Sequence, residues 1–262
     1  MAGTVTRWVR FEHDGGQGFG TLVGDQIAVH AGEMFGGAEP TGATVAVADI
    51  RLLAPCNPSK MLALWNNFRE LGTKLGIEPP AEPLFFIKAA SCYAGPDATV
   101  RRPSGYTGKV VFEGELGIVI GRTCCRADED AAAAAIFGYT CVNDLTAIGI
   151  LTRDPSFPQW ARAKSADGFG PFGPAIATGL DPATLQVRTL VDGKERQNYL
   201  VSDAIFGPVE LVRRLSHDLT LNPGDVICLG TSLGAGALMK PESVVDVVID
   251  GIGTLRTTFA SA

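Results

Sequence analysis

Two glutamates, two positions apart, interrupt an otherwise apolar stretch at residues 110–120, VVFEGELGIVI. On a β-strand, residues i and i+2 point to the same face, so Glu113 and Glu115 should project side by side. Adjacent carboxylates repel each other and lose hydration when they are sheltered, unless water or a cation compensates. The ordinary interpretation is the solvent face of an edge strand. The apolar neighbours argue against it, because they predict a strand that is mostly buried.

A third carboxylate, Asp144, ends another short apolar stretch and follows Asn143. Three carboxylates without an imidazole or thiolate suit a hard divalent cation, Mg²⁺ first, with Mn²⁺ or Ca²⁺ as alternatives. The three histidines, His13, His30 and His217, are not spaced for a zinc site. From spacing alone, a metal site and a solvated acidic face both remain open.

Composition describes an ordinary globular protein. The chain has 262 residues, 46% hydrophobic and 19% charged, which suits one large domain or a large domain with a small one attached. A net charge of −6 without a basic stripe argues against nucleic acid and against anionic membrane surfaces as partners. The N-terminus lacks the apolar region of a secretory signal, and the apolar runs are strand-sized. Six cysteines without a CxxC pair read as reduced thiols. We expect a soluble cytoplasmic protein.

The first part of the chain predicts a small β-rich unit. Residues 4–11 alternate as a strand, and residues 20–29 continue as strand around a Gly-Asp turn. Residues 32–43 are typical of a loop, and a short strand at 50–53 precedes Ala-Pro. We therefore predict an N-terminal domain at 1–57 and a main domain at 58–262.

Strand patterns also outnumber helix patterns in the main domain. The clearest hairpin, at 185–199, turns at Asp192-Gly193. A helix is predicted from Asp128, as its N-cap, through residue 137. Residues 149–174 are rich in glycine and proline and predict an ordered irregular loop. Because strands do not alternate regularly with helices, the sequence favours a β-rich α+β fold over a doubly wound one.

Several motifs occur in a fixed order from about residue 60 to the C-terminus: GKVVFEGELGIVIGR, GYTCVNDLTA, QWARAKSADGFGPFGP, NPGDVICLGTSLG and VVIDGIGTLRTTF. Together they resemble the fumarylacetoacetate hydrolase superfamily. The resemblance implies a mixed β-roll of several sheets with a few helices, usually a homodimer. It also implies that Glu113, Glu115 and Asp144 hold Mg²⁺ or Mn²⁺. Members act on small 2-oxo and 1,3-dicarbonyl acids, and the metal stabilises charge on the enolate oxygen.

The resemblance implies further site residues. Lys164 would line the site, where it could hold a substrate oxygen, stabilise an oxyanion or move a proton. Lys88 would lie near the entrance, and Gly230 and Thr231 match a Gly-Thr loop that binds substrate. Arg162 could serve the substrate carboxylate or form a scaffold ion pair. The ordinary alternatives are two surface lysines and a tight turn.

One departure from the family concerns proton transfer. Many members carry a His–Glu pair on a mobile lid, where it activates water or moves protons. At the matching positions of residues 67–74 this chain has Leu71 and Lys74. Leucine cannot accept a proton, so the pair is absent. Glu70 is the predicted catalytic substitute and Glu78 a second one; otherwise both are solvated lid charges.

A second departure follows Asp144, where the family often has Arg-Asp and this chain has Ile148 and Gly149. A substrate-facing arginine is lost there, or Arg153 replaces it from a changed loop. We expect a more apolar site and a substrate that differs from fumarylacetoacetate or fumarylpyruvate.

The sequence leaves three hypotheses for the function of this protein. The leading hypothesis is a metal-dependent enzyme that hydrolyses a C–C bond in a small 2-oxo or 1,3-dicarbonyl acid. The missing His–Glu pair favours a keto–enol isomerase or a decarboxylase on the same substrates, since neither needs an attacking hydroxide. A non-catalytic homologue that binds metal and a small acid is the alternative of another class.

Overall fold

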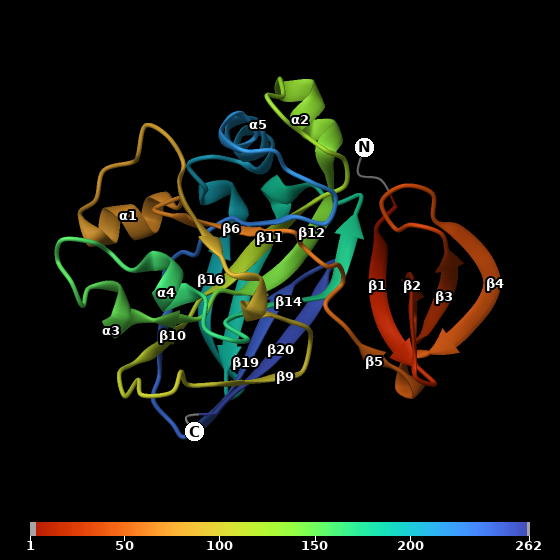
Figure 1. Cartoon of the computed structure of the whole chain (residues 1–262), viewed down its shortest axis with the longest axis horizontal. Coiled ribbons are helices and arrows are strands. Elements are labelled where there is room, and N and C mark those ends of the chain that lie inside the picture. The colour runs from red at the N-terminus through yellow and green to blue at the C-terminus, as the bar shows by residue number, and fades with distance from the viewer. Residues whose placement is uncertain (1–3, 261–262) are drawn as a thin grey trace.

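The computed structural model describes residues 4–260 of the chain. Its strands form sheets of twelve, five and three strands, and its helices are short. Figure 1 shows the first strands at one end of the molecule, with the other sheets and the helices gathered beside them. The predicted β-rich α+β fold, with several sheets and a few helices, is confirmed.

The N-terminal strands form antiparallel hairpins, as their alternation predicts. They are β1 (Thr6–His13), β2 (Gly16–Val23), β3 (Gln26–Ala31), β4 (Glu39–Ala46) and β5 (Arg51–Leu52). Residues 39–43, expected in a loop, instead begin β4. This strand is a largely exposed edge of the sheet and pairs with β3 through backbone hydrogen bonds, which need no apolar face. Because β1 also pairs with β14 (Gly170–Thr178), the sheet continues into the rest of the chain. The domain boundary after residue 57 stays a prediction.

The twelve-stranded sheet carries β11 (Gly114–Ile120), a seven-residue strand in which every residue is buried. From β14 the order continues through β12, β11, β17, β6 and β7, and β8 pairs with β14. The bounds of these strands are β6 (Met61–Trp65), β7 (Leu84–Lys88), β8 (Tyr93–Ala94), β12 (Ile136–Asn143) and β17 (Val226–Cys228).

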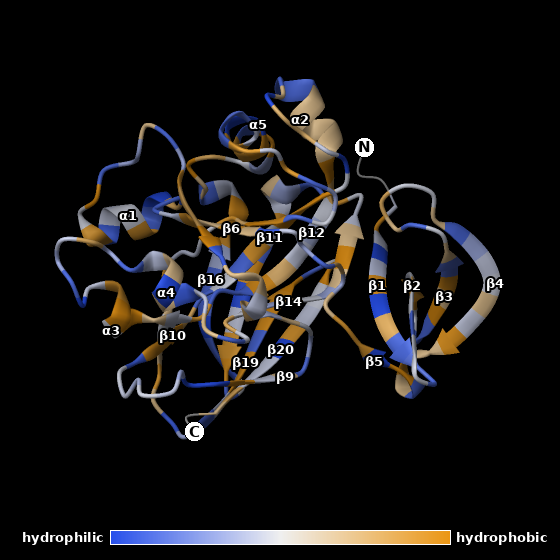
Figure 2. Cartoon of the chain, viewed as in Figure 1, coloured by the Kyte–Doolittle hydropathy of each residue, from blue (hydrophilic) through white to orange (hydrophobic). Residues whose placement is uncertain are grey.

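A second layer covers this sheet. Its five strands are β16 (Lys194–Leu200), β15 (Gln186–Val191), β19 (Glu242–Ile249), β20 (Gly253–Ala260) and β9 (Ala98–Arg101), and they pack against β11, β12 and β14. The side chains between the layers, among them Ile118, Val187 and Val247, are fully buried. Figure 2 shows this central region as a concentration of hydrophobic strands. The predicted β15–β16 hairpin turns at Asp192-Gly193, where both residues have positive φ.

The stretch at 110–120 is not one strand as expected. It divides into β10 (Val110–Phe112), in a small sheet with β13 (Thr146–Ala147) and β18 (Gly236–Leu238), and β11 in the large sheet. The chain changes sheets at Glu113, because β10 and β11 have different hydrogen-bonding partners on either side of it.

Five α-helices occur in the described residues: α1 (Arg69–Leu75), α2 (Glu129–Ala135), α3 (Ile148–Leu151), α4 (Trp160–Lys164) and α5 (Pro208–Asp218). Single 3₁₀ turns lie at Val47–Asp49, Ala90–Cys92, Pro182–Thr184 and Val201–Asp203. The Asp128 carboxylate caps α2, as predicted, but the helix ends two residues early because β12 begins at Ile136. The expected irregular loop at 149–174 contains α3, α4 and the start of β14. Within residues 4–260, no helix is both long enough and apolar enough to cross a membrane; cytoplasmic location stays a prediction.

Substitution of Ile118 by alanine tests the buried centre of β11. Ile118 is fully buried, so Ile118→Ala should lower the free energy of unfolding by about 2–5 kcal/mol in urea titration. Val23 is 66% exposed, so Val23→Ala should change the free energy of unfolding by less than about 0.5 kcal/mol. Equal effects of the two substitutions would contradict this account of the core.

Candidate active site

The three predicted metal ligands meet at one point. Oxygen atoms of Glu113, Glu115 and Asp144 lie within 4.8 Å of one another. Glu113 occupies the break between β10 and β11, Glu115 follows on β11, and Asp144 comes directly after the neighbouring strand β12. A backbone hydrogen bond of 2.8 Å from the Asp144 N–H to the Glu113 carbonyl fixes the two segments together. The site therefore depends on the register between β11 and β12.

Two buried lysines neutralise part of this charge. The Lys164 ammonium donates to Asp144 Oδ2 at 2.6 Å and to Glu113 Oε2 at 2.7 Å. The Lys88 ammonium donates to Asp144 Oδ1 and to the carbonyls of Lys164 and Phe169. The side chains of Lys88 and Lys164 are 0% and 4% exposed, so neither is the surface lysine of the ordinary interpretation. Lys88 lies behind Asp144 and does not line the cavity, so its expected place near the entrance is wrong, and a substrate-binding role for it stays a prediction.

The surroundings shift the pKa values of the site in opposite directions. Burial, reinforced by the Asp144 charge, raises the pKa of Glu115 well above its ordinary value. Burial also opposes ionisation of Asp144, but the ammonium groups of Lys164 and Lys88 outweigh it and lower the pKa of that carboxyl. Burial would lower the pKa of Lys164, yet the carboxylates of Asp144 and Glu113 raise it. Lys164 therefore holds its proton at neutral pH.

The donor set fits a hard divalent cation. One oxygen of Glu115 accepts a hydrogen bond of 2.8 Å from the Gly230 N–H, whereas its other oxygen, Oε1, is buried and has no hydrogen-bond partner within residues 4–260. A buried carboxylate oxygen without a partner is costly, and a cation would satisfy it. When all three carboxylates are ionised, as metal binding requires, they exceed the two ammonium groups by one negative charge. Mg²⁺ and Mn²⁺ prefer such all-oxygen sites.

A hydrogen-bond network holds Gly114, the residue between the two glutamates. Gln197 Oε1 accepts from the Gly114 N–H at 2.9 Å, and the Tyr199 hydroxyl donates to the Gly114 carbonyl at 2.7 Å. Thr231 donates to the same carbonyl at 3.0 Å and accepts from Gln197 Nε2 at 2.9 Å. A Cβ on Gly114 would lie 2.0 Å from Thr189 Oγ1, so a larger residue does not fit. Thr231 and Gly230 thus position the carboxylates.

Three residues of the site were not predicted from the sequence. Gln197 and Tyr199 lie on the buried face of β16, and the alternation of that strand was the available signal. Thr146, which donates to Glu113 Oε1 at 2.8 Å, follows Asp144 by two positions and was also overlooked.

A cavity of about 160 Å³ opens beside Glu113 and Lys164. It is lined by Leu64, Trp65, Asn66, Leu71, Phe86, Glu113, Thr146, Ile148, Leu151, Trp160, Lys164 and Thr231. None of these residues, which all belong to the described part of the chain, is a histidine. Leu71 and Ile148 are two of the four positions at which this chain departs from the residues that the family resemblance implies, and both line this cavity.

Two predicted site residues lie elsewhere. Glu70 is exposed at the start of α1, and its N–H donates to Asp203 Oδ2 at 3.0 Å. It lines a different surface hollow, with Gln186 and Asn198. Arg162 is exposed on α4 and does not line the cavity. A catalytic role for Glu70 and a substrate-binding role for Arg162 stay predictions that this placement does not support.

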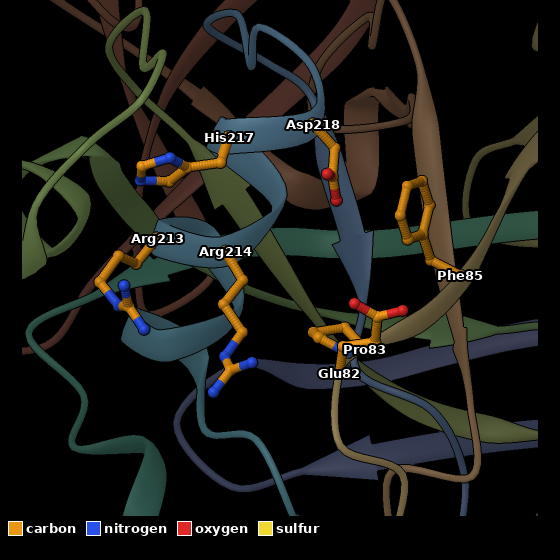
Figure 3. A pocket seen from close by; sticks show the side chains of 7 residues that line it. All are labelled: Glu82, Pro83, Phe85, Arg213, Arg214, His217 and Asp218. Atoms are coloured by element: carbon orange, nitrogen blue, oxygen red, sulfur yellow. The ribbon is translucent and has the colours of Figure 1, made fainter.

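A larger hollow, of about 520 Å³, lies between α5 and the segment before β7 (Figure 3). Its lining mixes both signs of charge: Glu82, Pro83, Phe85, Arg213, Arg214, His217 and Asp218. Arg213 and Arg214 both donate to Glu210, at 2.8 Å and 2.5 Å, so their charges are already engaged. None of the predicted site residues lines this hollow.

Comparison with known families agrees with this geometry. A family model described as "Fumarylacetoacetate (FAA) hydrolase C-terminal" matches residues 60–260, and one described as "Rv2993c-like, N-terminal" matches residues 6–55. The chain therefore belongs to the fumarylacetoacetate hydrolase family and is an enzyme of that family.

Similar proteins include several isomerases. The chain is 32% identical over 250 residues to oxaloacetate tautomerase YisK of Bacillus subtilis, covering 88% of this chain and 82% of that protein. The structure of 2-hydroxyhepta-2,4-diene-1,7-dioate isomerase from Mycobacterium marinum matches with a TM-score of 0.88 and 35% identity, over 98% of each chain. That of 5-carboxymethyl-2-hydroxymuconate delta-isomerase from Mycobacterium smegmatis matches with a TM-score of 0.89 and 35% identity, over 98% of this chain and 100% of that one.

The Asp144 carboxylate should be the electrostatic centre of the site. Asp144→Asn leaves Lys88 buried without a carboxylate, which should lower the free energy of unfolding by about 3–5 kcal/mol in urea titration. The matched control is Asp250→Asn. Asp250 is 91% exposed and pairs with Arg188 at 3.1 Å, so its loss should cost less than about 1 kcal/mol. A loss at Asp144 no larger than the control would contradict this account.

Proposed function

We propose that this chain is a divalent-metal-dependent isomerase that interconverts the keto and enol forms of small 2-oxo acids with a second carbonyl group. One observation carries the proposal: the carboxylate–lysine cluster opens into a cavity whose lining offers no imidazole. The isomerase and tautomerase names of the similar proteins favour the same reaction.

Glu113, Glu115 and Asp144 would hold Mg²⁺ or Mn²⁺, which supplies a Lewis acid for the keto oxygen of the substrate. Lys164 stays protonated between Asp144 and Glu113, so it serves as a hydrogen-bond donor to negative charge that develops on a substrate oxygen. The Gly114 network keeps the carboxylates in place throughout. The apolar residues around the cavity exclude water, which strengthens these electrostatic interactions.

Hydrolysis of a C–C bond is the less favoured alternative. It requires an activated water, and Leu71 faces the cavity where the family resemblance would place a histidine. Decarboxylation needs only the stabilised enolate and is the second candidate. A homodimer and the choice of metal ion also stay proposals.

The proposal can be tested with oxaloacetate and acetylpyruvate as substrates, by following the absorbance of the enol and identifying the products by NMR. The protein is first stripped of metal and then supplied with Mg²⁺ or Mn²⁺. We expect metal-dependent enol–keto conversion without cleavage. Glu115→Gln should slow it by about 100-fold, because it removes an anionic ligand from the Lewis acid site.

The matched control is Glu39→Gln, which makes the same change at an exposed position of β4 and should leave the rate unchanged. Cleavage products would establish hydrolysis, and CO₂ release would establish decarboxylation. Conversion that Glu115→Gln does not alter would contradict the proposed site.

A further inference from the structure

One wall of the cavity is aromatic and aliphatic, and it begins beside the cluster, where the Lys164 ammonium lies 5.7 Å from the centroid of the Phe86 ring. The Trp160 ring packs against Trp65, with centroids 5.3 Å apart, and stacks on Phe86 at 5.2 Å and 18°. Ile148 and Leu151 of α3 complete the wall, and Figure 2 shows α3 as hydrophobic. Since Ile148 is 38% exposed, the wall reaches from the buried site to the surface.

The hydroxyl groups and the amide NH₂ group that line this cavity are already engaged, and the wall itself contains the indole N–H groups of Trp65 and Trp160. The Asn66 amide donates to the Glu78 carbonyl at 3.0 Å, and the Thr231 hydroxyl is held between Gly114 and Gln197. Thr146 donates to Glu113. Away from the carboxylates, a bound molecule therefore meets hydrocarbon and aromatic surface.

The charge balance of the cavity also favours a substrate with only one carboxylate. Lys164 is the one cation among the lining residues, all of which lie within residues 4–260, and its ammonium already contacts Glu113 and Asp144. With the three carboxylates ionised, the two lysines and a divalent ion leave one positive charge. A substrate with a single carboxylate balances it, whereas a dicarboxylate leaves an uncompensated negative charge where water is scarce.

We propose that the wall of Trp65, Phe86, Ile148, Leu151 and Trp160 binds an uncharged alkyl or aryl group of the substrate, so that this enzyme prefers monoanionic acyl-substituted 2-oxo acids over dicarboxylic ones. This inference rests on the proposed function, because it places the substrate's 2-oxo acid end at the carboxylate–lysine cluster. The cavity of about 160 Å³ suits a small group, since a cavity of roughly 150 Å³ accommodates benzene.

Binding of an isosteric pair tests the preference without turnover. 5-Methyl-2-oxohexanoate carries an isopropyl group where 2-oxoglutarate carries a carboxylate. Calorimetry on the Mn²⁺-loaded protein should show the branched acid bound at least about tenfold more tightly, because the dicarboxylate would leave an unpaired charge at the wall. Along a series of unbranched 2-oxo acids, affinity should rise about fourfold for each added methylene until the cavity is full.

A substitution in the wall should change the preference. Ile148→Arg places a cation beside the bound group and should lower the affinity ratio of the pair by about tenfold, mainly through tighter binding of 2-oxoglutarate. The control is Phe157→Arg, which adds the same charge at a 66% exposed position that does not line the cavity. It should leave the ratio unchanged.

Turnover separates this inference from the proposed function. Acetylpyruvate and oxaloacetate differ mainly in a methyl group against a carboxylate oxygen, and kcat/KM should favour acetylpyruvate by roughly tenfold. Conversion of neither substrate would overturn the proposed function. Conversion of both, together with equal or tighter binding of 2-oxoglutarate by the unsubstituted protein, would leave the proposed function standing and overturn the apolar subsite.

Discussion

The site depends on two buried carboxylates and a half-buried one, held beside two buried lysines. Asp144 is almost fully buried and remains ionised because Lys88 and Lys164 each donate to one of its oxygens. Such a cluster is tolerated only when its geometry is fixed, since unpaired charges are costly in the interior. The pairing of β11 with β12, the position of β7 and the end of α4 all serve this requirement, because they deliver Glu115, Asp144, Lys88 and Lys164 to one place.

The change of sheet at Glu113 gives the cluster its shape. On one continuous strand, the side chains of Glu113 and Glu115 would point to the same face of a single sheet. In the structure the break between β10 and β11 lets the two carboxylates converge with Asp144, and the hairpin of β15 and β16 fixes the intervening Gly114 through Gln197. The second layer of strands thus positions the site as well as covering the core.

Local sequence signals predicted the hairpin at Asp192-Gly193 and singled out the three carboxylates, but they left a metal site and a solvated acidic face both open. The family motifs added Lys164 and Lys88, which composition alone would have placed at the surface. The break at Glu113 could not be predicted, since it arises from pairing with strands distant in the sequence. The alternation of β16 could place Gln197 on a buried face but could not predict its contact with Gly114, which is distant in the sequence. Glu70 was predicted as a substitute for the missing His–Glu pair, but the structure exposes it on α1.

If Glu113, Glu115 and Asp144 together bind one divalent ion, anomalous diffraction from crystals soaked in MnCl₂ should show it. We expect one strong Mn²⁺ peak at about 2.0–2.3 Å from an oxygen of each carboxylate, with Glu115 Oε1 among the ligands. Soaked crystals in which the site is well defined in the electron density would contradict metal binding if they show no peak at this position and if Lys164 still joins Glu113 to Asp144.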